Sequence, residues 1–298
     1  MFRTFEISDP ALAPEGLHFV TVKSAALRQR SDLLLFVPRQ ALAPEQGLQA
    51  LGGAEGAEGA DCAEGAESAE GLRDVPIVIL LHGVYGSHWA WAFKGAAHRT
   101  AQRLVDEGAV PPLVLAMPSD GLWGDGSGYV AHARQDFERW IVDEVPAATG
   151  QACAACSEAS PLFIAGLSMG GFGALRLAGR HAQRFVAAAG HSSITDVAQI
   201  DGLLAETRAG WAATPADVNV LDALRGAPGP LPALRFDCGR DDPFIAANRQ
   251  LHADLQAAGI AHEYAEHEGG HGWDYWTRHL EDTLRFFGAA LMHRRHSS

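Results

Sequence analysis

The sequence has few lysines, few cysteines and no long apolar run. Its 298 residues include two lysines, Lys23 and Lys94, and carry a formal net charge of −13. A chain of this charge is not attracted to a nucleic-acid backbone or to an anionic membrane surface, so we expect neither as a partner. The longest apolar run, at residues 77–81, is far shorter than the ~20 residues that cross a bilayer.

Cysteine is too scarce for a disulfide framework in a chain of this length, so we expect free thiols. Cys153 and Cys156 form a C-x-x-C pair, which is also found in redox centres and in zinc sites. No second pair completes the four ligands of a structural zinc, and we expect no metal. The first ten residues lack the apolar segment of a secretory signal, and we therefore expect a cytoplasmic protein.

Residues 47–74 form a near-repeat of Ala-Glu-Gly. No large apolar side chain occurs between Leu51 and Leu72, so this segment cannot bury enough surface to offset its ordering entropy. We predict a disordered acidic insertion in a single domain that spans residues 1–298. A second segment, 192–231, interrupts the alternation of expected strands and helices. It predicts a small helical excursion, which is a usual place for a substrate lid.

Short apolar runs alternate with longer amphipathic stretches through most of the chain. The runs typical of buried strands are 75–81, 113–116, 162–166, 185–190 and 234–238. The stretches with helical spacing are 135–145, 170–181, 248–258 and 274–292. This alternation predicts an α/β fold with a mostly parallel sheet and helices on both faces. Residues 17–23 and 33–37 predict an antiparallel pair at the leading edge.

The stretch G-L-S-M-G, at 166–170, matches the G-x-S-x-G turn in which a strained serine joins a strand to a helix. Gly166 and Gly170 supply the small residues that crowd each other in such a turn. The amide of Met169 would lie at a helix N-terminus, where negative charge is favoured. The alternative is a structural or phosphate-binding turn, although no lysine follows as in a P-loop. We predict that Ser168 is a nucleophile.

Chain order then indicates a base and an acid, since this turn is followed by an acid and later by a histidine. His271 lies in a glycine-flanked loop between HEYAEHE, at 262–268, which is typical of a last strand, and the last helix. Asp241 and Asp242 lie in a loop at the edge where α/β folds place their chemistry. We predict that Asp242 orients His271. The alternative for Asp242 is a helix N-cap ahead of Pro243.

A second donor for an oxyanion is expected in the loop after the strand at 75–81. The backbone amide of Val84 or Tyr85 is the candidate, and we favour Val84. His82, at the strand end, is expected to be structural. We expect the substrate to contact Tyr85, Trp123 and Trp273. Trp123 lies in a glycine-rich loop, and the alternative for this loop is a mobile surface loop.

Together, these motifs resemble the esterase D family of α/β-hydrolases, which includes S-formylglutathione hydrolases, feruloyl esterases and tributyrin-type esterases. The resemblance covers about residues 17–291 apart from the insertion. It rests on LLHGVYGSHWAW, AMPSDG, IAGLSMGGFGALRLA, CGRDDPF and GGHGWDYW. It implies Ser168 as nucleophile, Asp242 as acid, His271 as base, and the amides of Met169 and Val84 as oxyanion donors.

One departure from the formylglutathione branch bears on the substrate. That branch carries a cysteine shortly after the glycine of the oxyanion loop, whereas HGVYGS has none. We therefore expect a serine carboxylic ester hydrolase that acts on small esters of short acyl chains, with no cofactor. The alternatives are an S-formylglutathione hydrolase or other thioesterase, and a catalytically silent α/β-hydrolase that only binds. The sequence leaves the choice between a monomer and a homo-oligomer open.

Overall fold

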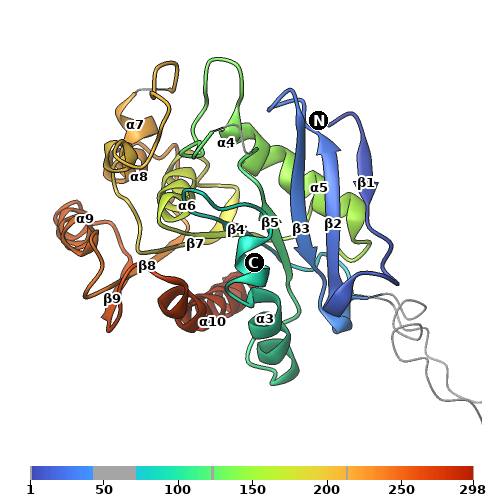
Figure 1. The fold of residues 1–298 in the computed structure, drawn as a ribbon. Coiled ribbons are helices and arrows are strands. Elements are labelled where there is room, and N and C mark those ends of the chain that lie inside the picture. The colour runs from blue at the N-terminus through green and yellow to red at the C-terminus, as the bar shows by residue number, and fades with distance from the viewer. Residues whose placement is uncertain (1, 43–71, 122–123, 213, 298) are drawn as a thin grey trace, which may run out of the picture.

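The computed structural model describes residues 2–42, 72–121, 124–212 and 214–297 (Figure 1). Most of the expected acidic insertion at 47–74 lies outside these ranges, and so does Trp123. The single-domain prediction for the whole chain therefore stays a prediction. No helix in the described ranges is both long enough and apolar enough to cross a membrane.

The described strands form one nine-stranded sheet in the order β1-β2-β3-β5-β4-β6-β7-β8-β9. Their bounds are β1 Phe5–Ile7, β2 Leu17–Lys23, β3 Arg30–Phe36, β4 Ile77–Leu81, β5 Val114–Pro118, β6 Leu162–Leu167, β7 Phe185–His191, β8 Ala233–Gly239 and β9 Glu263–His267. The pairs from β1 to β5 are antiparallel, and all pairs from β5 to β9 are parallel. The expected α/β fold with an antiparallel leading edge is confirmed.

Helices cover both faces of this sheet (Figure 1). The helices are α2 Ala90–Phe93, α3 Ala97–Asp106, α4 Phe137–Arg139, α5 Val145–Ala152, α6 Met169–Arg180, α7 Pro215–Val218, α8 Val220–Arg225, α9 Ile245–Ala257 and α10 Trp273–Ser297. One apolar cluster includes side chains of α5, α6, α8 and α9, and the other includes side chains of α2, α3 and α10. Burial of β4, β5 and β6 on both faces explains their uninterrupted apolar sequences.

Two helical regions differ from the expectation. The helix expected at 135–145 extends to Ala152 and contains a π-helical turn, η3, at Trp140–Glu144. We did not predict α3, because alanine and polar residues make up most of its sequence. Its short buried side chains include Ala97 and Ala101, which are weak signals of apolar periodicity.

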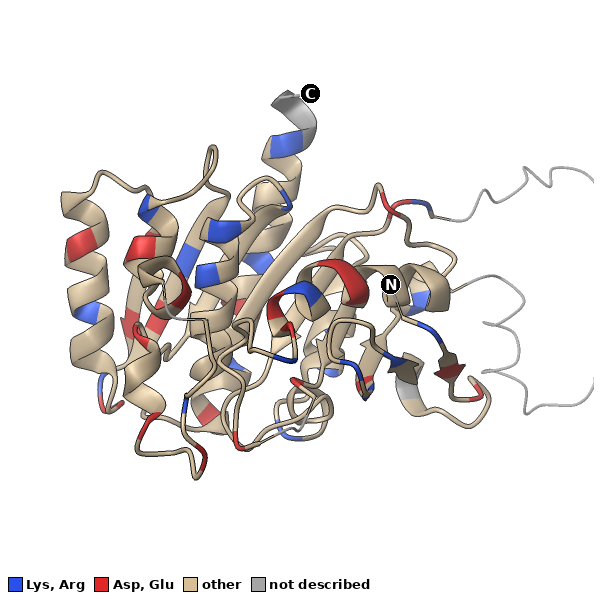
Figure 2. Ribbon diagram, turned by 90° about the horizontal axis from the view of Figure 1, so that it is seen from above, with Lys and Arg blue, Asp and Glu red and all other residues tan. Residues whose placement is uncertain are grey.

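Charge is spread over the periphery of the described chain. Figure 2 shows acidic and basic residues on the surrounding helices and loops, often on the same helix. The strands β4, β5 and β6 carry no charged residue. The carboxyl ends of these parallel strands meet at one edge of the sheet, where the loops that carry Val84, Ser168, Asp242 and His271 also lie.

Candidate active site

Ser168 occupies the sharp turn between β6 and α6, with backbone angles φ 55° and ψ −118°. This conformation is strained for a residue with a side chain. A Cβ added to Gly166 would lie 2.2 Å from the oxygen of Gly170, and one added to Gly170 would lie 2.4 Å from the oxygen of Leu81. The expectation that both flanking residues must be small is confirmed, and a Cβ alone would already clash at either position.

The structure brings Ser168, His271 and Asp242 into one chain of hydrogen bonds. The Oγ of Ser168 is 3.0 Å from Nε2 of His271, and Nδ1 of His271 is 2.8 Å from Oδ2 of Asp242. With the carboxylate as acceptor, Nδ1–H donates to Asp242, and Nε2 presents its lone pair to the serine hydroxyl. This arrangement allows His271 to remove the proton of Ser168.

The alternative of Asp242 as a helix N-cap is wrong, although one of its oxygens holds the turn before α9. Its side chain is fully buried, and its second oxygen, Oδ1, accepts the backbone N–H of Phe244 at 2.8 Å. The helix α9 begins at Ile245 with Phe244 as its N-cap residue. The carboxylate therefore holds the start of this turn with one oxygen and His271 with the other.

Backbone contacts tie the loop of Asp242 to the loop of His271. The amide of Arg240 donates to the oxygen of His267 at 2.8 Å, and the amide of Asp241 donates to the oxygen of Gly269 at 3.0 Å. A Cβ added to Gly239 would lie 2.2 Å from that same oxygen of Gly269. A glycine at the end of β8 is thus required for the two loops to approach each other.

Two aromatic side chains flank His271. The ring of Phe244 lies 5.2 Å and the ring of Trp276 lies 5.0 Å from the imidazole, both edge to face. Both occur in motifs noted above, since Phe244 closes CGRDDPF and Trp276 closes GGHGWDYW. Their spacing in the sequence does not reveal that they converge on one histidine.

The expected oxyanion loop lies beside Ser168. A Cβ added to Gly83 would lie 3.3 Å from Cβ of Ser168, and one added to Gly126 would lie 2.7 Å from Sδ of Met169 and 3.4 Å from the side chain of Val84. The amides of Val84 and Met169 have no hydrogen-bond acceptor within the described parts of the chain. Both N–H groups thus remain available to a ligand oxygen.

His82 is built into this loop as a structural residue. Its Nε2 accepts the amide of Asp120 at 3.1 Å, so its Nδ1 carries the proton and donates to the oxygen of Gly83 at 2.8 Å. The buried hydroxyl of Tyr129 donates to the oxygen of His82 at 3.0 Å. The backbone oxygens of His82 and Gly83 therefore each accept a hydrogen bond from a side chain.

Tyr85 and Trp273, which we expect to contact substrate, have different surroundings. Tyr85 is 68% exposed, has φ 62°, and donates from its hydroxyl to the oxygen of Leu203. Trp273 packs against Trp91 and Trp276, with ring centroids 5.6 and 5.3 Å away. It therefore supports Trp276, which itself contacts His271. Trp123 lies outside the described residues.

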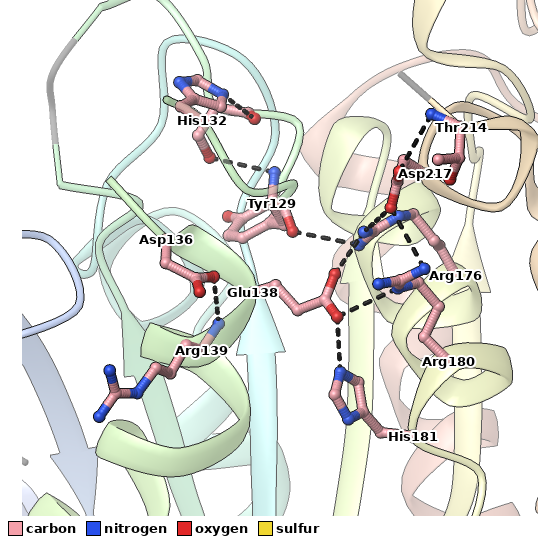
Figure 3. A network of polar contacts seen from close by, with 11 residues as sticks. Tyr129, His132, Asp136, Glu138, Arg139, Arg176, Arg180, His181, Thr214 and Asp217 are labelled. Atoms are coloured by element: carbon pink, nitrogen blue, oxygen red, sulfur yellow. Dashed lines mark hydrogen bonds and ion pairs between the residues drawn. The ribbon is translucent and has the colours of Figure 1, made fainter. Parts of the chain in front are cut away.

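A buried charge network surrounds Arg176, on the helix that follows the serine turn (Figure 3). The guanidinium of Arg176, on α6, is fully buried and pairs with Glu138 of α4 and with Asp217 of α7. Burial raises the pKa of Glu138, but the hydrogen bond from His181 and the charges of Arg176 and Arg180 outweigh it and bring that pKa to about 2. The network joins α4, α6 and α7 through ionised groups.

The expected free thiols are confirmed for the three cysteines in the described ranges. Cys153, Cys156 and Cys238 are all buried and unbridged. Burial is the largest cause that raises the pKa of Cys238, so that thiol is protonated near neutral pH.

Comparison with known proteins agrees with this fold. The model of the Esterase family, described as "Putative esterase", matches residues 67–287. An acetyl esterase of Caldicellulosiruptor saccharolyticus is 28% identical over 226 residues, which cover 70% of this chain and 81% of that protein.

Solved structures show the same fold at low identity. A fluorophosphonate-binding serine hydrolase of Staphylococcus aureus is 18% identical, with a TM-score of 0.70, over 92% of this chain and 98% of that chain. An S-formylglutathione hydrolase of Agrobacterium tumefaciens is also 18% identical, with a TM-score of 0.68, over 96% of this chain and 98% of that chain. The family model covers most of the sequence, and the chain therefore belongs to the Esterase family and is an esterase with an α/β fold.

Proposed function

We propose that Ser168 is the nucleophile of this esterase, that His271 is its general base and that Asp242 orients the histidine. The observation that carries this proposal is the pair of hydrogen bonds, 3.0 and 2.8 Å long, that links the three side chains at the carboxyl edge of the sheet. The strained turn at Ser168 supports it, because such a turn exposes the hydroxyl to a substrate.

In the proposed reaction, Oγ of Ser168 attacks the ester carbonyl as its proton moves to Nε2 of His271. The carbonyl oxygen gains the negative charge and receives hydrogen bonds from the amides of Met169 and Val84. His271 then donates its proton to the leaving alcohol as the ester C–O bond breaks. An acyl-enzyme remains, and water activated by His271 hydrolyses it. Asp242 stabilises the imidazolium in both steps.

We propose that the substrates are esters with short acyl chains. The curated relative with 28% identity is named an acetyl esterase. The oxyanion loop also lacks the cysteine of the formylglutathione branch. Both observations favour an ester of a small acid such as acetic acid.

We also propose that the segment 192–231 covers the site. The hydroxyl of Tyr85 donates to Leu203 of this segment, and the amide of Ala205 donates to Oδ2 of Asp125 at 2.7 Å. The ring of Trp211 stacks on His132 with centroids 4.5 Å apart. These contacts join the segment to the loops that follow β4 and β5.

The buried thiols support a reducing compartment, since disulfides form mainly in oxidising ones. We propose that the protein works in the cytoplasm on a small ester, without nucleic acid or membrane. Cell fractionation followed by immunoblotting tests this location, and recovery in a secreted or membrane fraction would contradict it.

Hydrolysis of p-nitrophenyl acetate and butyrate tests the catalytic assignment. We expect wild type to cleave acetate with the higher kcat/KM, and Ser168→Ala to lose at least about 10³-fold in rate. Ser193→Ala is a matched control, because Ser193 is a buried serine near the same turn whose hydroxyl has no partner in the described chain. An active Ser168→Ala variant would refute the assignment.

A thioesterase is the second candidate, since S-formylglutathione hydrolases share the fold. S-formylglutathione compared with p-nitrophenyl acetate separates the two functions. A kcat/KM for the thioester that exceeds the ester value by an order of magnitude would favour the thioesterase.

A further inference from the structure

The strand β8 carries a fully buried carboxylate, that of Asp237, in addition to Asp242 in the loop that follows. Side chains from three elements donate to it. They are His191 of β7, whose Nδ1 is 3.1 Å from each carboxylate oxygen, Tyr275 of α10, whose hydroxyl donates to Oδ1 at 2.9 Å, and Arg235 of β8, whose guanidinium donates to Oδ2 at 3.4 Å.

The carboxylate of Asp237 is ionised in this setting. Burial raises its pKa, but His191 outweighs burial through its charge and its hydrogen bond, and the pKa is lowered. A buried charge that loses a donor is strongly destabilised, so the carboxylate restricts where its donors can lie. Since His191 ends β7 and Tyr275 lies in the first turn of α10, Asp237 sets the distance between these two elements.

The end of β7 is also the support of the serine turn. The amide of Ser168 donates to the oxygen of His191 at 2.9 Å, and the amide of Ile194 donates to the oxygen of Ser168 at 3.3 Å. Between these two residues, the amide of Ser192 donates to the backbone oxygen of Asp237 at 2.8 Å. Asp237 therefore holds, through its carboxylate and its backbone, the segment to which both backbone groups of Ser168 bind. A strained residue keeps its conformation only where its surroundings hold it.

On the other side of the carboxylate, the start of α10 follows His271 closely. The amides of Tyr275 and Trp276 both donate to the oxygen of Gly272, at 3.1 and 3.2 Å. The ring of Trp276 packs edge to face on His271. The hydroxyl of Tyr275 thus attaches this helical turn, and with it the loop of His271, to Asp237.

A second contact joins α10 to the same histidine–aspartate pair. Oγ1 of Thr283 lies 3.1 Å from Nε2 of His191, and both residues are fully buried. The helix is therefore bonded at two positions, to Asp237 through Tyr275 and to His191 through Thr283. A movement of α10 along β7 would break at least one of these bonds.

We propose that Asp237 is a positioning residue of this esterase, which sets the distance between Oγ of Ser168 and Nε2 of His271. This role rests on the functions proposed above for those two side chains. The bonds run from Ser168 through the end of β7 to Asp237, and from Asp237 through Tyr275 to the turn beside His271. They join the two sides of the 3.0 Å contact across which the serine proton moves, and proton transfer depends on that short separation.

Hydrolysis of p-nitrophenyl acetate by Tyr275→Phe tests this role, with the reactive serines counted by complete reaction with a phosphonofluoridate. The variant keeps the ring and loses the hydroxyl that binds Asp237. We expect kcat per titrated serine to fall at least about tenfold, with KM within about twofold of wild type, because the serine–histidine geometry affects the chemical steps. A purely structural role would lower the number of titrated serines and leave kcat per serine unchanged, which would overturn the proposal.

Tyr264→Phe is the matched control for this substitution. The hydroxyl of Tyr264 also donates to a carboxylate at 2.9 Å, that of Glu266 on β9. The same chemical group is therefore removed from a bond of the same length that does not lead to Ser168. We expect wild-type kcat per titrated serine, and a loss equal to that of Tyr275→Phe would overturn the proposal.

Two further comparisons do not depend on whether Tyr275→Phe folds, which circular dichroism establishes for every variant. Thr283→Val should lower kcat per titrated serine about threefold, since it removes the second bond from α10. His191→Asn keeps a donor near the position of Nδ1 and should retain more of kcat than His191→Leu, which has none. Wild-type kcat per serine in Thr283→Val, or equal values in the two His191 variants, would overturn the proposal. Ester hydrolysis by Ser168→Ala is a separate result, which would refute the role of Ser168 itself and this proposal with it.

Discussion

Arg176 donates a hydrogen bond from its fully buried guanidinium to the backbone oxygen of Tyr129, 3.2 Å away (Figure 3). Tyr129 in turn donates from its hydroxyl to the oxygen of His82. The helix that follows Ser168 and the loop that carries Val84 are therefore connected through a single tyrosine. The backbone of Tyr129 has φ 55°, which this pair of contacts helps to maintain.

Tyr129→Phe removes the hydroxyl that holds the oxygen of His82. We expect kcat for p-nitrophenyl acetate to fall about fivefold to tenfold with little change in KM, because one hydrogen bond of about 1 kcal/mol positions a group needed in the transition state. Steady-state kinetics measure both constants. Tyr264→Phe is the control, since that hydroxyl bonds Glu266 on β9 and its loss should leave kcat unchanged. Equal effects of the two substitutions would argue against a positioning role for Tyr129.

The ionisation of Glu138 makes the free energy of unfolding depend on pH. Its pKa falls from an ordinary value of 4.5 to about 2 in the folded chain. A depressed carboxyl pKa stabilises the fold fully above the unfolded value, and this stabilisation is lost as the pH falls from about 4.5 to about 2. Glu138→Gln should lower the free energy of unfolding by on the order of 3 kcal/mol at pH 6.

Urea unfolding at several pH values measures this effect. The difference between wild type and Glu138→Gln should shrink as the pH falls through that window. Glu158→Gln, at an exposed glutamate, should match wild type at every pH. A difference for Glu138→Gln that stays constant down to pH 2 would contradict the assignment.

Asp242 and Asp241 are neighbouring carboxylates with different expected roles. Asp242→Asn should lower kcat by about 10³–10⁴-fold, because an amide that donates to Nδ1 forces His271 into the wrong tautomer. Asp241→Asn should retain the rate, since Asp241 joins the loop of His271 through its backbone amide. Steady-state kinetics on p-nitrophenyl acetate decide between the two. A large loss for Asp241→Asn and none for Asp242→Asn would reverse the assignment.

Gly166→Ala should destabilise the chain severely. The added Cβ would meet the oxygen of Gly170 at 2.2 Å, and neither backbone can move without disturbing the turn at Ser168. We expect a loss of at least about 3 kcal/mol in the free energy of unfolding, as for a severe overpacking. Gly150→Ala is the matched control in α5, where the nearest atom to the new Cβ is 3.8 Å away. That substitution should stabilise the helix by about 0.5–1 kcal/mol.

Local patterns were sufficient to predict much of this fold and the grouping of three site residues. The strands β4, β5 and β6 are continuous apolar runs, and Ser168, Asp242 and His271 each follow a strand in chain order. Contacts between distant residues were not predictable in this way. Glu138 and Arg176 pair across 38 positions, and the approach of Phe244 and Trp276 to His271 depends on how two loops fold back.

Residues with two partners were also hard to assign from sequence. Asp242 matched both an N-cap and a catalytic acid, and its two oxygens hold the turn and the histidine at once. His267 and His279 belong to different elements, and their rings stack only when β9 and α10 come together.

The backbone bonds between the loops after β8 and β9 determine how the site can come apart. Arg240 and Asp241 bind the loop of His271 directly, so imidazole and carboxylate belong to one rigid piece. Ser168 belongs to another, since its amide donates to the oxygen of His191 at the end of β7. A shift of β8 and β9 relative to β7 would therefore change the serine–histidine distance first. The histidine–aspartate bond, and with it the tautomer of the imidazole, would stay as it is.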